Sequence, residues 1–275
     1  MTVFVVDNNS KDNTAEVVGA YQQRVSFIRY IFEGQQGLSA ALNAGIRAGT
    51  GELVAMINDD EEVDVHWFEV IHELFQNTSF DFAGGPYQPR WSAEKPDWVS
   101  KEFGAVLGWV DGGDTAQQYG PAFDGMLMGG NAVIKRSALD KVGLYNTNLG
   151  RTDKELGSCE DEDMFQRLLA SGLRGQYLPA LIIYHYIPSE RMTRRYHRRW
   201  CWGRGTSMGI LARTTKGNAT ELFGIPRWKI RYAAVGAWRA LKGRLRLELS
   251  NEAFWGELRL WDLAGYIHGR FFRSV

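Results

Sequence analysis

Two groups of acidic residues carry the side chains that are best suited to chemistry. Asn58, Asp59 and Asp60 follow an apolar run, and residues 160–163, all acidic, precede a segment of helical periodicity. Carboxylates at the end of a buried strand can hold a divalent cation that binds substrate phosphates, while a separate carboxylate can act as a general base. Together the two groups indicate metal-assisted chemistry on a phosphate-bearing substrate, with a base for a second substrate.

Each group also has a simpler interpretation, and the spacing alone leaves both open. Residues 58–62 could form an acidic surface turn, because short acidic motifs recur by chance. Acids at 160–163 could favour a helix start, where they meet the positive end of the helix dipole and Ser158 could act as the cap. Four consecutive acids exceed what capping needs, however, and their mutual repulsion in a partly buried site would raise a pKa toward that of a base. Asp161 is the predicted base.

Asp7 and His185 are two further candidates, each with an ordinary structural alternative. Asp7 ends an apolar run and could cap the turn formed by residues 8–10. His185 lies within the apolar segment 182–186, where a histidine can be either a satisfied strand residue or a metal ligand.

The elements that must position these residues alternate along the first two thirds of the chain. Strands are predicted over 3–6, 25–30, 53–57, 82–83, 132–134 and 176–186, and helices over 14–22, 38–48, 65–75, 137–142 and 162–171. This rhythm predicts an α/β fold with a mostly parallel sheet and flanking helices. Ligands gather beyond the carboxyl ends of such strands, where Asp7 and residues 58–60 fall. Residues 86–128 break the rhythm and predict a structured insertion over that crevice, where the acceptor is selected.

Charge divides the chain into two unlike parts. Residues 1–189 hold 14 Lys and Arg against 26 Asp and Glu, whereas residues 190–275 hold 18 against 6, which gives −12 and +12. An acidic part suits a metal and a neutral substrate, while a basic part suits phosphate on lipid, nucleic acid or nucleotide. We therefore expect a catalytic domain over 1–188 and a basic, Trp-rich helical extension over 189–275.

The extension contains a long amphipathic helix, predicted from Pro226 to Leu249. Arg231, Arg239, Lys242 and Arg246 lie mostly opposite an apolar face of Ile230, Ala234, Trp238, Leu241 and Leu245. A cationic amphipathic helix with aromatic residues predicts binding to an anionic membrane surface. The alternative is a helical cap on the catalytic core that uses Arg to pair with the acidic part. Nucleic-acid binding would rest on charge alone and is not expected.

Other compositional signals narrow the class of protein. Two cysteines give neither a disulfide framework nor a zinc cluster, so a reducing compartment is expected. The apolar part of residues 1–7 is too short for the signal peptide of an exported protein, and no 18 apolar residues run together, so we expect a cytoplasmic protein, peripheral on the inner face of the cell membrane. No Gly-x-Gly-x-x-Gly follows a strand, which disfavours dinucleotide and P-loop sites.

Taken in order, the motifs resemble those of the family 2 glycosyltransferases over residues 1 to about 190. The first half of the match consists of Val5-Val6-Asp7-Asn8-Asn9-Ser10 with Asp12 and Thr14, then residues 37–45, then Ile57-Asn58-Asp59-Asp60. The second half consists of Gly129-Gly130-Asn131, Val142-Gly143, Glu160-Asp161, Arg167, Gly172, Leu178-Pro179 and Tyr184-His185.

The resemblance implies a GT-A (Rossmann-like) fold, a nucleotide-sugar donor, Mg²⁺ or Mn²⁺, and inverting transfer to the hydroxyl of a saccharide or lipid-linked acceptor. It implies donor contacts from Asp7, Asn43, Asn58 and Asp59. It further implies metal ligation by Asp60, with Asp59 and His185 beside it. Asp161 matches the position of the family's general base.

Three departures from the family pattern are visible. The family normally begins one strand and helix earlier, so half of the nucleotide-base pocket is expected to be missing. Asn58 replaces the first Asp of the metal motif, and Leu42 stands where many members have Arg. Of the processive members' Gln-x-x-Arg-Trp only Arg199-Trp200 is met, so polymer extrusion is not expected. The main hypothesis is a non-processive enzyme of cell-surface polysaccharide or glycolipid synthesis. The alternative is a truncated, non-catalytic homologue that acts as a binding or partner protein.

Overall fold

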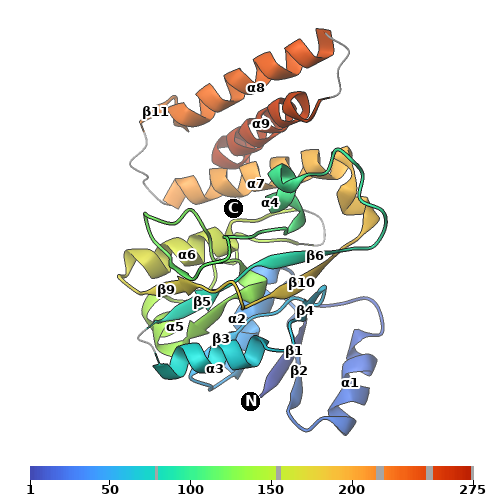
Figure 1. Ribbon diagram of the computed structural model, residues 1–275, viewed down its shortest axis with the longest axis vertical. Helices are drawn as coiled ribbons and strands as arrows, with labels where there is room; N and C mark the ends of the chain where they lie inside the picture. Colours follow the sequence, from blue (N-terminus) through green and yellow to red (C-terminus); the bar gives the residue numbers. More distant parts are fainter. Residues whose placement is uncertain (78–79, 153–155, 215–219, 246–249, 274–275) are drawn as a thin grey trace.

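A mixed five-stranded sheet lies at the middle of the molecule (Figure 1). The computed structural model describes residues 1–77, 80–152, 156–214, 220–245 and 250–273. The strands, in spatial order, are β3 (Leu53–Ala55), β8 (Val133–Lys135), β5 (Phe82–Gly84), β9 (Gly175–Tyr177) and β7 (Gln117–Gln118). Because β8 is antiparallel to both β3 and β5 while β9 is parallel to β5, strands β3, β5 and β9 share one direction.

Helices cover both faces of this sheet. Phe82 and Ile134 point to one face and belong to the core that includes side chains of α2 (Leu38–Ala48), α5 (Arg136–Val142) and α6 (Glu160–Ala170). Their neighbours Ala83 and Val133 point to the other face and pack with Trp67 of α3 (Trp67–Asn77). The alternation follows the two-residue period of a strand and confirms the predicted α/β architecture.

Two smaller sheets flank the central one. The parallel strands β1 (Val3–Asp7) and β2 (Ile28–Phe32) are joined by α1 (Thr14–Arg24). The second sheet has the order β4 (Glu61–Val63), β10 (Ile183–Ile187) and β6 (Tyr87–Trp91). The single strand predicted over 176–186 is wrong: it is two strands, β9 and β10, in different sheets. Pro179 lies between them and cannot donate a ladder hydrogen bond, so the strand breaks there.

The insertion over residues 86–128 joins the central sheet to the C-terminal helices. It contains β6, the 3-10 turn η1 (Lys101–Phe103), the helix α4 (Gly104–Leu107) and β7. Val99 and Leu107 pack with Ile187 of β10 and with the turn η3 (Ser189–Met192). Phe103 packs instead with Phe254 of α9 (Asn251–Ile267). The insertion therefore contacts the C-terminal helices as well as the sheet.

Three long helices stack outward from the sheet in the order α7 (Arg194–Thr214), α9 and α8 (Arg227–Leu245) (Figure 1). The hairpin of β11 (Glu221–Leu222) and β12 (Ile225–Pro226) leads into α8, and the π-helical turn η4 (His268–Phe272) follows α9. Within the described residues, no helix is both long and apolar enough to span a bilayer.

Glycines let α7 and α9 cross with their backbones in contact. A Cβ on Gly205 or Gly209 of α7 would collide with a backbone oxygen of Asp262 or Tyr266 in α9. The relation is mutual, because a Cβ on Gly265 would collide with α7 backbone, as would one on Gly269 after α9. Each pair is spaced by four residues, which places both glycines on one helix face. The four positions therefore define where α9 sits.

The predicted apolar face of α8 does not form the core. The helix buries Lys229, Ala233, Gly236 and Gly243, while Trp238 is 62% exposed and Leu245 is 77% exposed. Gly236 and Gly256 bring α8 and α9 into close contact, so the small-residue side of α8 faces inward. The amphipathic pattern identified the helix, and its apolar face lies mostly on the outside. Arg246, part of the same prediction, lies outside the described residues.

Candidate functional site

Gly129 and Gly130, in the 3-10 turn η2 over residues 129–131, lie between the two acidic groups. The N–H of Gly129 donates a 2.9 Å hydrogen bond to Oδ2 of Asp161, and a Cβ on Gly129 would collide with that carboxylate. A Cβ on Gly130 would collide with the carboxylate of Glu61 and would lie 2.5 Å from Nδ2 of Asn58. The two groups are thus neighbours across a glycine pair.

A buried asparagine fixes this turn. Asn131 accepts a 2.9 Å hydrogen bond from the indole Nε1 of Trp67 and donates a 2.7 Å bond to the carbonyl of Leu181. All of its side chain is buried, so its polar atoms must find protein partners. Elements on both sides of the site are therefore tied to η2.

Asp60 lies in a cluster of charged and polar side chains at the end of β10. Its Oδ2 is 3.0 Å from Nη2 of Arg191 and 3.3 Å from Nε2 of His185. Nη1 of Arg191 also lies 3.0 Å from Nε2 of His185. Burial acts to raise the pKa of Asp60, but the interactions with His185 and Arg191 outweigh it and hold the pKa below its usual value.

His185 is a buried strand residue that the insertion covers. Its Nδ1 is buried and has no hydrogen-bond partner among the described residues. Gly108, in the left-handed region at φ 66°, lies against the ring, where a Cβ would be 2.8 Å from Nδ1. The insertion therefore reaches the site through a glycine that leaves room for the imidazole.

Asp161 and Glu160 begin α6 in an environment that disfavours their charged forms. Burial raises the pKa of Asp161, and the hydrogen bond from Gly129 opposes that rise only in part. Burial and the neighbouring charge of Asp161 raise the pKa of Glu160. Asp161 Oδ1 and Glu160 Oε2 are buried without a hydrogen-bond partner among the described residues. Both groups are set to take up protons more readily than an exposed carboxylate would.

The start of α6 differs from the predicted capped start. The helix begins at Glu160 rather than residue 162, and Cys159 precedes it in the left-handed conformation at φ 73°. Cys159, not Ser158, occupies the N-cap position, and it makes no side-chain cap hydrogen bond. The backbone N–H of Ser158 donates to Ser207 Oγ at 3.1 Å. The acids of the first turn are therefore not accounted for by a serine cap.

The segment between Asn58 and Glu61 is locked by its own hydrogen bonds. The backbone N–H and Nδ2 of Asn58 each donate a 2.8 Å bond to the carboxylate of Glu61. Burial raises the pKa of Glu61 despite these bonds. Asp59, between them in sequence, is exposed to solvent. This turn holds Asn58 and leaves Asp59 accessible.

Asp7, at the end of β1, anchors the following turn as its structural alternative predicted. It accepts hydrogen bonds from the N–H of Ser10 at 2.8 Å and from the hydroxyl of Tyr30 at 2.7 Å. The bond from the Ser10 backbone is the largest cause of its lowered pKa. Asn8 extends the turn by donating to the carbonyl of Gln35 at 2.6 Å. Asp7 is therefore buried, with each carboxylate oxygen accepting a hydrogen bond.

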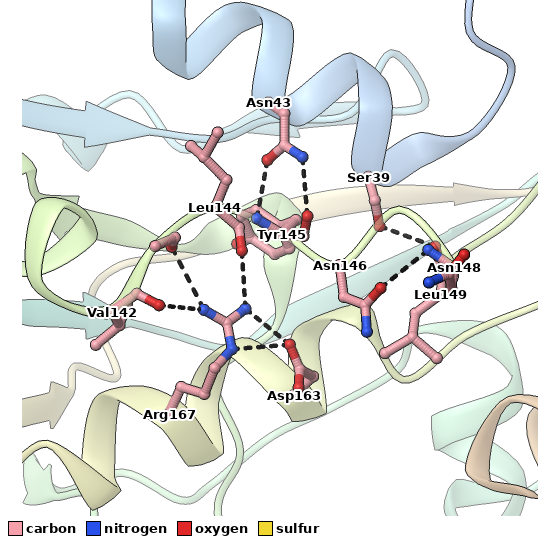
Figure 2. A network of polar contacts seen from close by, with 11 residues as sticks. Ser39, Asn43, Val142, Leu144, Tyr145, Asn146, Asn148, Leu149, Asp163 and Arg167 are labelled. Atoms are coloured by element: carbon pink, nitrogen blue, oxygen red, sulfur yellow. Dashed lines mark hydrogen bonds and ion pairs between the residues drawn. The ribbon is translucent and has the colours of Figure 1, made fainter. Parts of the chain in front are cut away.

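Asn43 is buried beside the segment that follows α5 (Figure 2). Its Nδ2 donates to the Tyr145 carbonyl and its Oδ1 accepts from the Tyr145 N–H, both at 2.8 Å. In the same network the guanidinium of Arg167 binds Asp163 and the carbonyls of Val142 and Leu144. Asn43 and Arg167 therefore hold the segment after α5 in place.

Asp60 and His185 are the side chains of this cluster that could hold a divalent cation together with substrate phosphates. Among the described residues, no three His, Cys, Asp or Glu side chains are grouped to hold a metal ion. Asp60 and His185 nevertheless supply one oxygen and one nitrogen donor, and the guanidinium of Arg191 already places a positive charge against both. Mg²⁺ sites commonly use one or two carboxylates together with substrate phosphates.

Sequence reasoning missed two features of the site. Arg191 was placed in the basic extension, and only the fold brings it back to Asp60. Glu61 was read as part of an acidic run rather than as the residue that holds Asn58. The glycine pair 129–130 before a strand was the one feature of the sequence that pointed to this arrangement. A glycine in such a place often marks a position where another group approaches the backbone closely.

Comparison with known proteins identifies the relatives of the chain. Residues 1–143 match the family described as Glycosyl transferase family 2. A glucosyl-dolichyl phosphate glucuronosyltransferase of Haloferax volcanii is 30% identical over 58% of this chain and 50% of the relative. The succinoglycan biosynthesis protein ExoM of Rhizobium meliloti is 23% identical over 70% of this chain and 58% of the relative. The chain thus spans about half the length of these relatives.

Among solved structures, the crystal structure of GalNAc-T7 with UDP, GalNAc and Mn²⁺ superposes with a TM-score of 0.50. The superposition covers 76% of this chain and 44% of the other at 12% sequence identity. At that identity the likeness concerns the fold alone, and it agrees with the GT-A architecture of the central sheet.

Proposed function

Because the chain belongs to glycosyl transferase family 2, we propose that it transfers a sugar from a nucleotide-sugar donor to an acceptor hydroxyl with inversion of configuration. The single observation that carries this proposal is the glycine pair that places Asp161 beside the segment containing Asn58 and Glu61. A base and a donor-binding segment in contact are what a direct displacement requires.

In the proposed reaction Asp161 acts as the general base. Its carboxylate takes the proton of the acceptor hydroxyl while the oxygen attacks the anomeric carbon from the side opposite the leaving group. The bond from the anomeric carbon to the nucleoside diphosphate breaks, and the diphosphate leaves with the bonding electrons. The raised pKa of Asp161 suits this role, because a base works best when its pKa approaches the working pH.

We place the donor diphosphate beside Asp60, His185 and Arg191. Arg191 offers a forked donor to phosphate oxygens, and Asp59 is exposed next to Asp60. A Mg²⁺ or Mn²⁺ ion held by Asp60 and His185 would neutralise the charge that develops on the leaving diphosphate. The rigid turn after Asp7 would contact the nucleoside. Asn43 is left out of the proposed donor contacts, since its amide is taken up by Tyr145.

For the acceptor we propose a saccharide linked to a lipid, used at the cytoplasmic face of a membrane. The name of the Haloferax volcanii relative describes transfer to a glucosyl-dolichyl phosphate, which is a sugar on a lipid phosphate. An enzyme of cell-surface polysaccharide or glycolipid synthesis would meet such a substrate at a bilayer.

The outer side of α8 supports contact with an anionic bilayer. Exposed apolar side chains recur every three or four residues along it, namely Trp228, Tyr232, Val235, Trp238, Leu241 and Leu245. The helix carries six Lys and Arg and no Asp or Glu. Lys242 lies over the ring of Trp238 at 5.2 Å, which keeps a cation beside the apolar stripe. Aromatic and basic residues in this arrangement suit the headgroup region of a membrane.

Calorimetric titration of UDP, GDP and dTDP with Mn²⁺, and then with a chelator, tests the donor site. We expect one nucleotide to bind only with the metal and the Asp60→Ala variant to lose that binding. Absence of binding to every nucleotide would support the alternative of a non-catalytic homologue that serves as a binding or partner protein.

A further inference from the structure

The hairpin of β11 and β12 turns on a phenylalanine whose backbone is in a conformation that bulky residues rarely adopt. Phe223 and Gly224 are the two central residues of the turn, and their φ angles are 53° and 73°. A two-residue hairpin turn with both φ angles positive is of type I′, for which Asn-Gly is a common pair. The left-handed region brings a Cβ close to the following carbonyl oxygen, so a phenylalanine there carries backbone strain.

The fold gains little from the ring of Phe223. The residue is 86% exposed, so its side chain adds almost nothing to the core of the chain. An asparagine would suit the turn better and would give up no buried contact. Backbone strain that the fold does not need is a reason to look for a function, and this function requires an apolar ring at the outermost point of the turn.

Further exposed aromatic side chains lie on the two segments next to this turn. A Cβ on Gly224 would be 3.1 Å from Cζ of Phe271, so the turn contacts η4. The hairpin also leads directly into α8, since the N–H of Arg227 donates to the carbonyl of Thr220 at 2.9 Å, and Figure 1 shows β11 beside the start of that helix. The exposed aromatic residues of the three segments form a group that we call the aromatic tip, namely Phe223, Trp228, Tyr232, Phe271 and Phe272.

Hydrogen bonds to α7 hold the η4 part of the tip in place. Arg213 of α7 donates from Nε to the carbonyl of Arg270 at 3.0 Å and from Nη2 to the carbonyl of Arg273 at 2.8 Å. Arg270 donates in return to the carbonyl of Ala212. The aromatic rings of η4 are therefore carried by a turn that is tied to the helical cap.

The exposure of the tip residues follows the depth that a bilayer would give them. Phe223 and Phe272, which are wholly apolar, are 86% and 73% exposed. Trp228 and Tyr232, which each carry a polar group, are 49% and 54% exposed. Trp and Tyr favour the headgroup level of a membrane, whereas apolar rings favour the acyl chains.

Charge near the tip favours an anionic surface. Arg270 and six further Lys and Arg belong to η4 and α8, and within the described hairpin, α8 and η4 the one acidic side chain is Glu221. Arg227 and Arg231 are exposed, each directly before an aromatic residue of the tip. Basic and aromatic residues in this combination are complementary to a bilayer with anionic headgroups.

We propose that the aromatic tip inserts into the acyl region of an anionic bilayer, with Phe223 as its deepest residue. The inference rests on the bilayer contact proposed above for α8 and deepens it, because insertion at one end of α8 would fix the orientation of the chain on the membrane. Trp228 and Tyr232 belong both to the tip and to the exposed stripe of α8, so the two surfaces are continuous.

A fluorophore at position 223 tests the insertion directly. Phe223→Cys is labelled with an environment-sensitive dye such as NBD. Burial raises the pKa of Cys159 and of Cys201 to about 12, so the introduced exposed thiol reacts first. With vesicles containing phosphatidylglycerol we expect a blue shift of the emission and quenching by lipids that carry a spin label on the acyl chain. Phe68→Cys, at a 52% exposed position of α3, is the control and should keep its emission in water.

A label at position 223 that stays in water while the chain sediments with the vesicles would overturn the proposal and would favour a protein partner for the tip. If the natural chain bound no vesicles, the contact of α8 and the insertion of the tip would both be rejected. Binding of UDP with Mn²⁺, measured on the same samples, shows separately whether the proposed donor site stands.

Phe223→Asn separates the role of the ring from its effect on the fold. Because asparagine tolerates a positive φ, we expect the variant to be at least as stable as the natural chain in urea unfolding. Its binding to the vesicles should be about tenfold weaker, because the ring that enters the acyl region is lost. Phe68→Ala should bind like the natural chain. Equal binding of Phe223→Asn and the natural chain would contradict the insertion of this residue.

Discussion

Asp60 and Asp161 belong to the same proposed site, yet their surroundings move their pKa values in opposite directions. Asp60 is held ionised through His185 and Arg191, whereas burial raises the pKa of Asp161. Groups with separated pKa values commonly divide the roles of electrostatic binding and proton transfer. At the scale of single residues, the two aspartates are therefore expected to fail in different ways when substituted.

Asp161→Asn is expected to spare metal-dependent nucleotide binding and to lower transfer by about 10²–10⁴-fold, the usual contribution of a general base. Asp60→Ala is expected to lose the binding itself. Calorimetry and a transfer assay on both variants give the comparison, with exposed Asp140→Asn as the control. Equal loss of both activities in both variants would contradict the separate roles.

Because the pKa of Asp161 is raised, transfer should fall on acidification at a pH above the ordinary aspartate value of 3.8.

Arg191→Gln is expected to bind Mn²⁺ alone more tightly and the Mn²⁺–UDP complex more weakly. The guanidinium now competes with a cation for Asp60, but it would also meet the diphosphate. We expect each effect to be about tenfold, equivalent to about 1.4 kcal/mol. Electron paramagnetic resonance of free Mn²⁺ measures the first effect and calorimetry the second. Arg90→Gln, which removes an exposed pairing with Glu62, is the control. If free Mn²⁺ bound equally to Arg191→Gln and to the natural chain, Arg191 would not act as a competing cation.

At the scale of elements, the glycine turn η2 sets the distance between the two acidic groups. Gly129→Ala would push its Cβ into the Asp161 carboxylate, so we expect strong loss of transfer and about 1–3 kcal/mol lower stability. A transfer assay and urea unfolding measure the two effects. Gly19→Ala is the matched control, because a Cβ there meets nothing within 4 Å and an Ala in the interior of α1 should stabilise the helix. Full activity of Gly129→Ala would show that the turn can shift to accept a Cβ without displacing the Asp161 carboxylate, and would contradict this prediction.

The start of α6 is expected to make stability depend on pH. The pKa of Glu160 is raised above its ordinary value of 4.5 by burial, so the folded chain binds this proton more tightly than the unfolded chain. Unfolding free energy should therefore fall as pH rises from about 5 to about 8. Glu160→Gln keeps the shape without the charge, and we expect it to flatten that dependence and to be more stable at the alkaline end.

Urea unfolding of this variant at both ends of the range gives the measurement. The exposed Glu52→Gln serves as the control and should follow the natural chain. An unchanged pH slope in Glu160→Gln would mean that the buried carboxyl does not control stability there.

The β1, α1 and α2 segments have clear periodicity and strong boundaries, and the structure confirms them within a few residues. The strand over 176–186 failed because apolar character hides a change of sheet at Pro179. The residues of the proposed base and metal site could be named from their motifs, but the contacts that Arg191 makes with Asp60 and Gly129 makes with Asp161 could not. Those contacts join segments far apart in sequence, and local patterns carry no information on such pairs.

At the scale of the whole molecule, the C-terminal helices both cover the core and present an outward face. Phe103 of the insertion and Phe254 of α9 share an apolar cluster with Cys201 of α7, so the cap that the sequence left as an alternative is present. Burial of His197 in the same region lowers its pKa to about 4, which indicates a neutral ring within the packing. The cap does not use up the apolar residues of α8, which remain outside.

The exposed stripe of α8 is expected to bind anionic vesicles. Sedimentation with vesicles containing phosphatidylglycerol should carry the chain down, whereas phosphatidylcholine vesicles or high salt should release it. A Trp238→Ala, Leu241→Ala double variant should bind at least about tenfold less, because it removes two exposed apolar side chains from the contact. Val65→Ala, which trims an 87% exposed residue near α3, is the control. Equal sedimentation of the double variant and the natural chain would remove α8 from the interface.

The close crossing of α7 and α9 limits which substitutions the fold accepts at four positions, namely Gly205, Gly209, Gly265 and Gly269. Any side chain at these positions must displace backbone of the opposite helix, so a change in one helix cannot be repaired by a smaller neighbour in the other. In a library of random variants selected only for folding, we expect these four codons to be depleted of change as strongly as core aromatic positions. Codons for the exposed residues of α8 should accept substitutions freely in that selection. We expect them to be depleted of change only in a selection where growth depends on the reaction at a membrane.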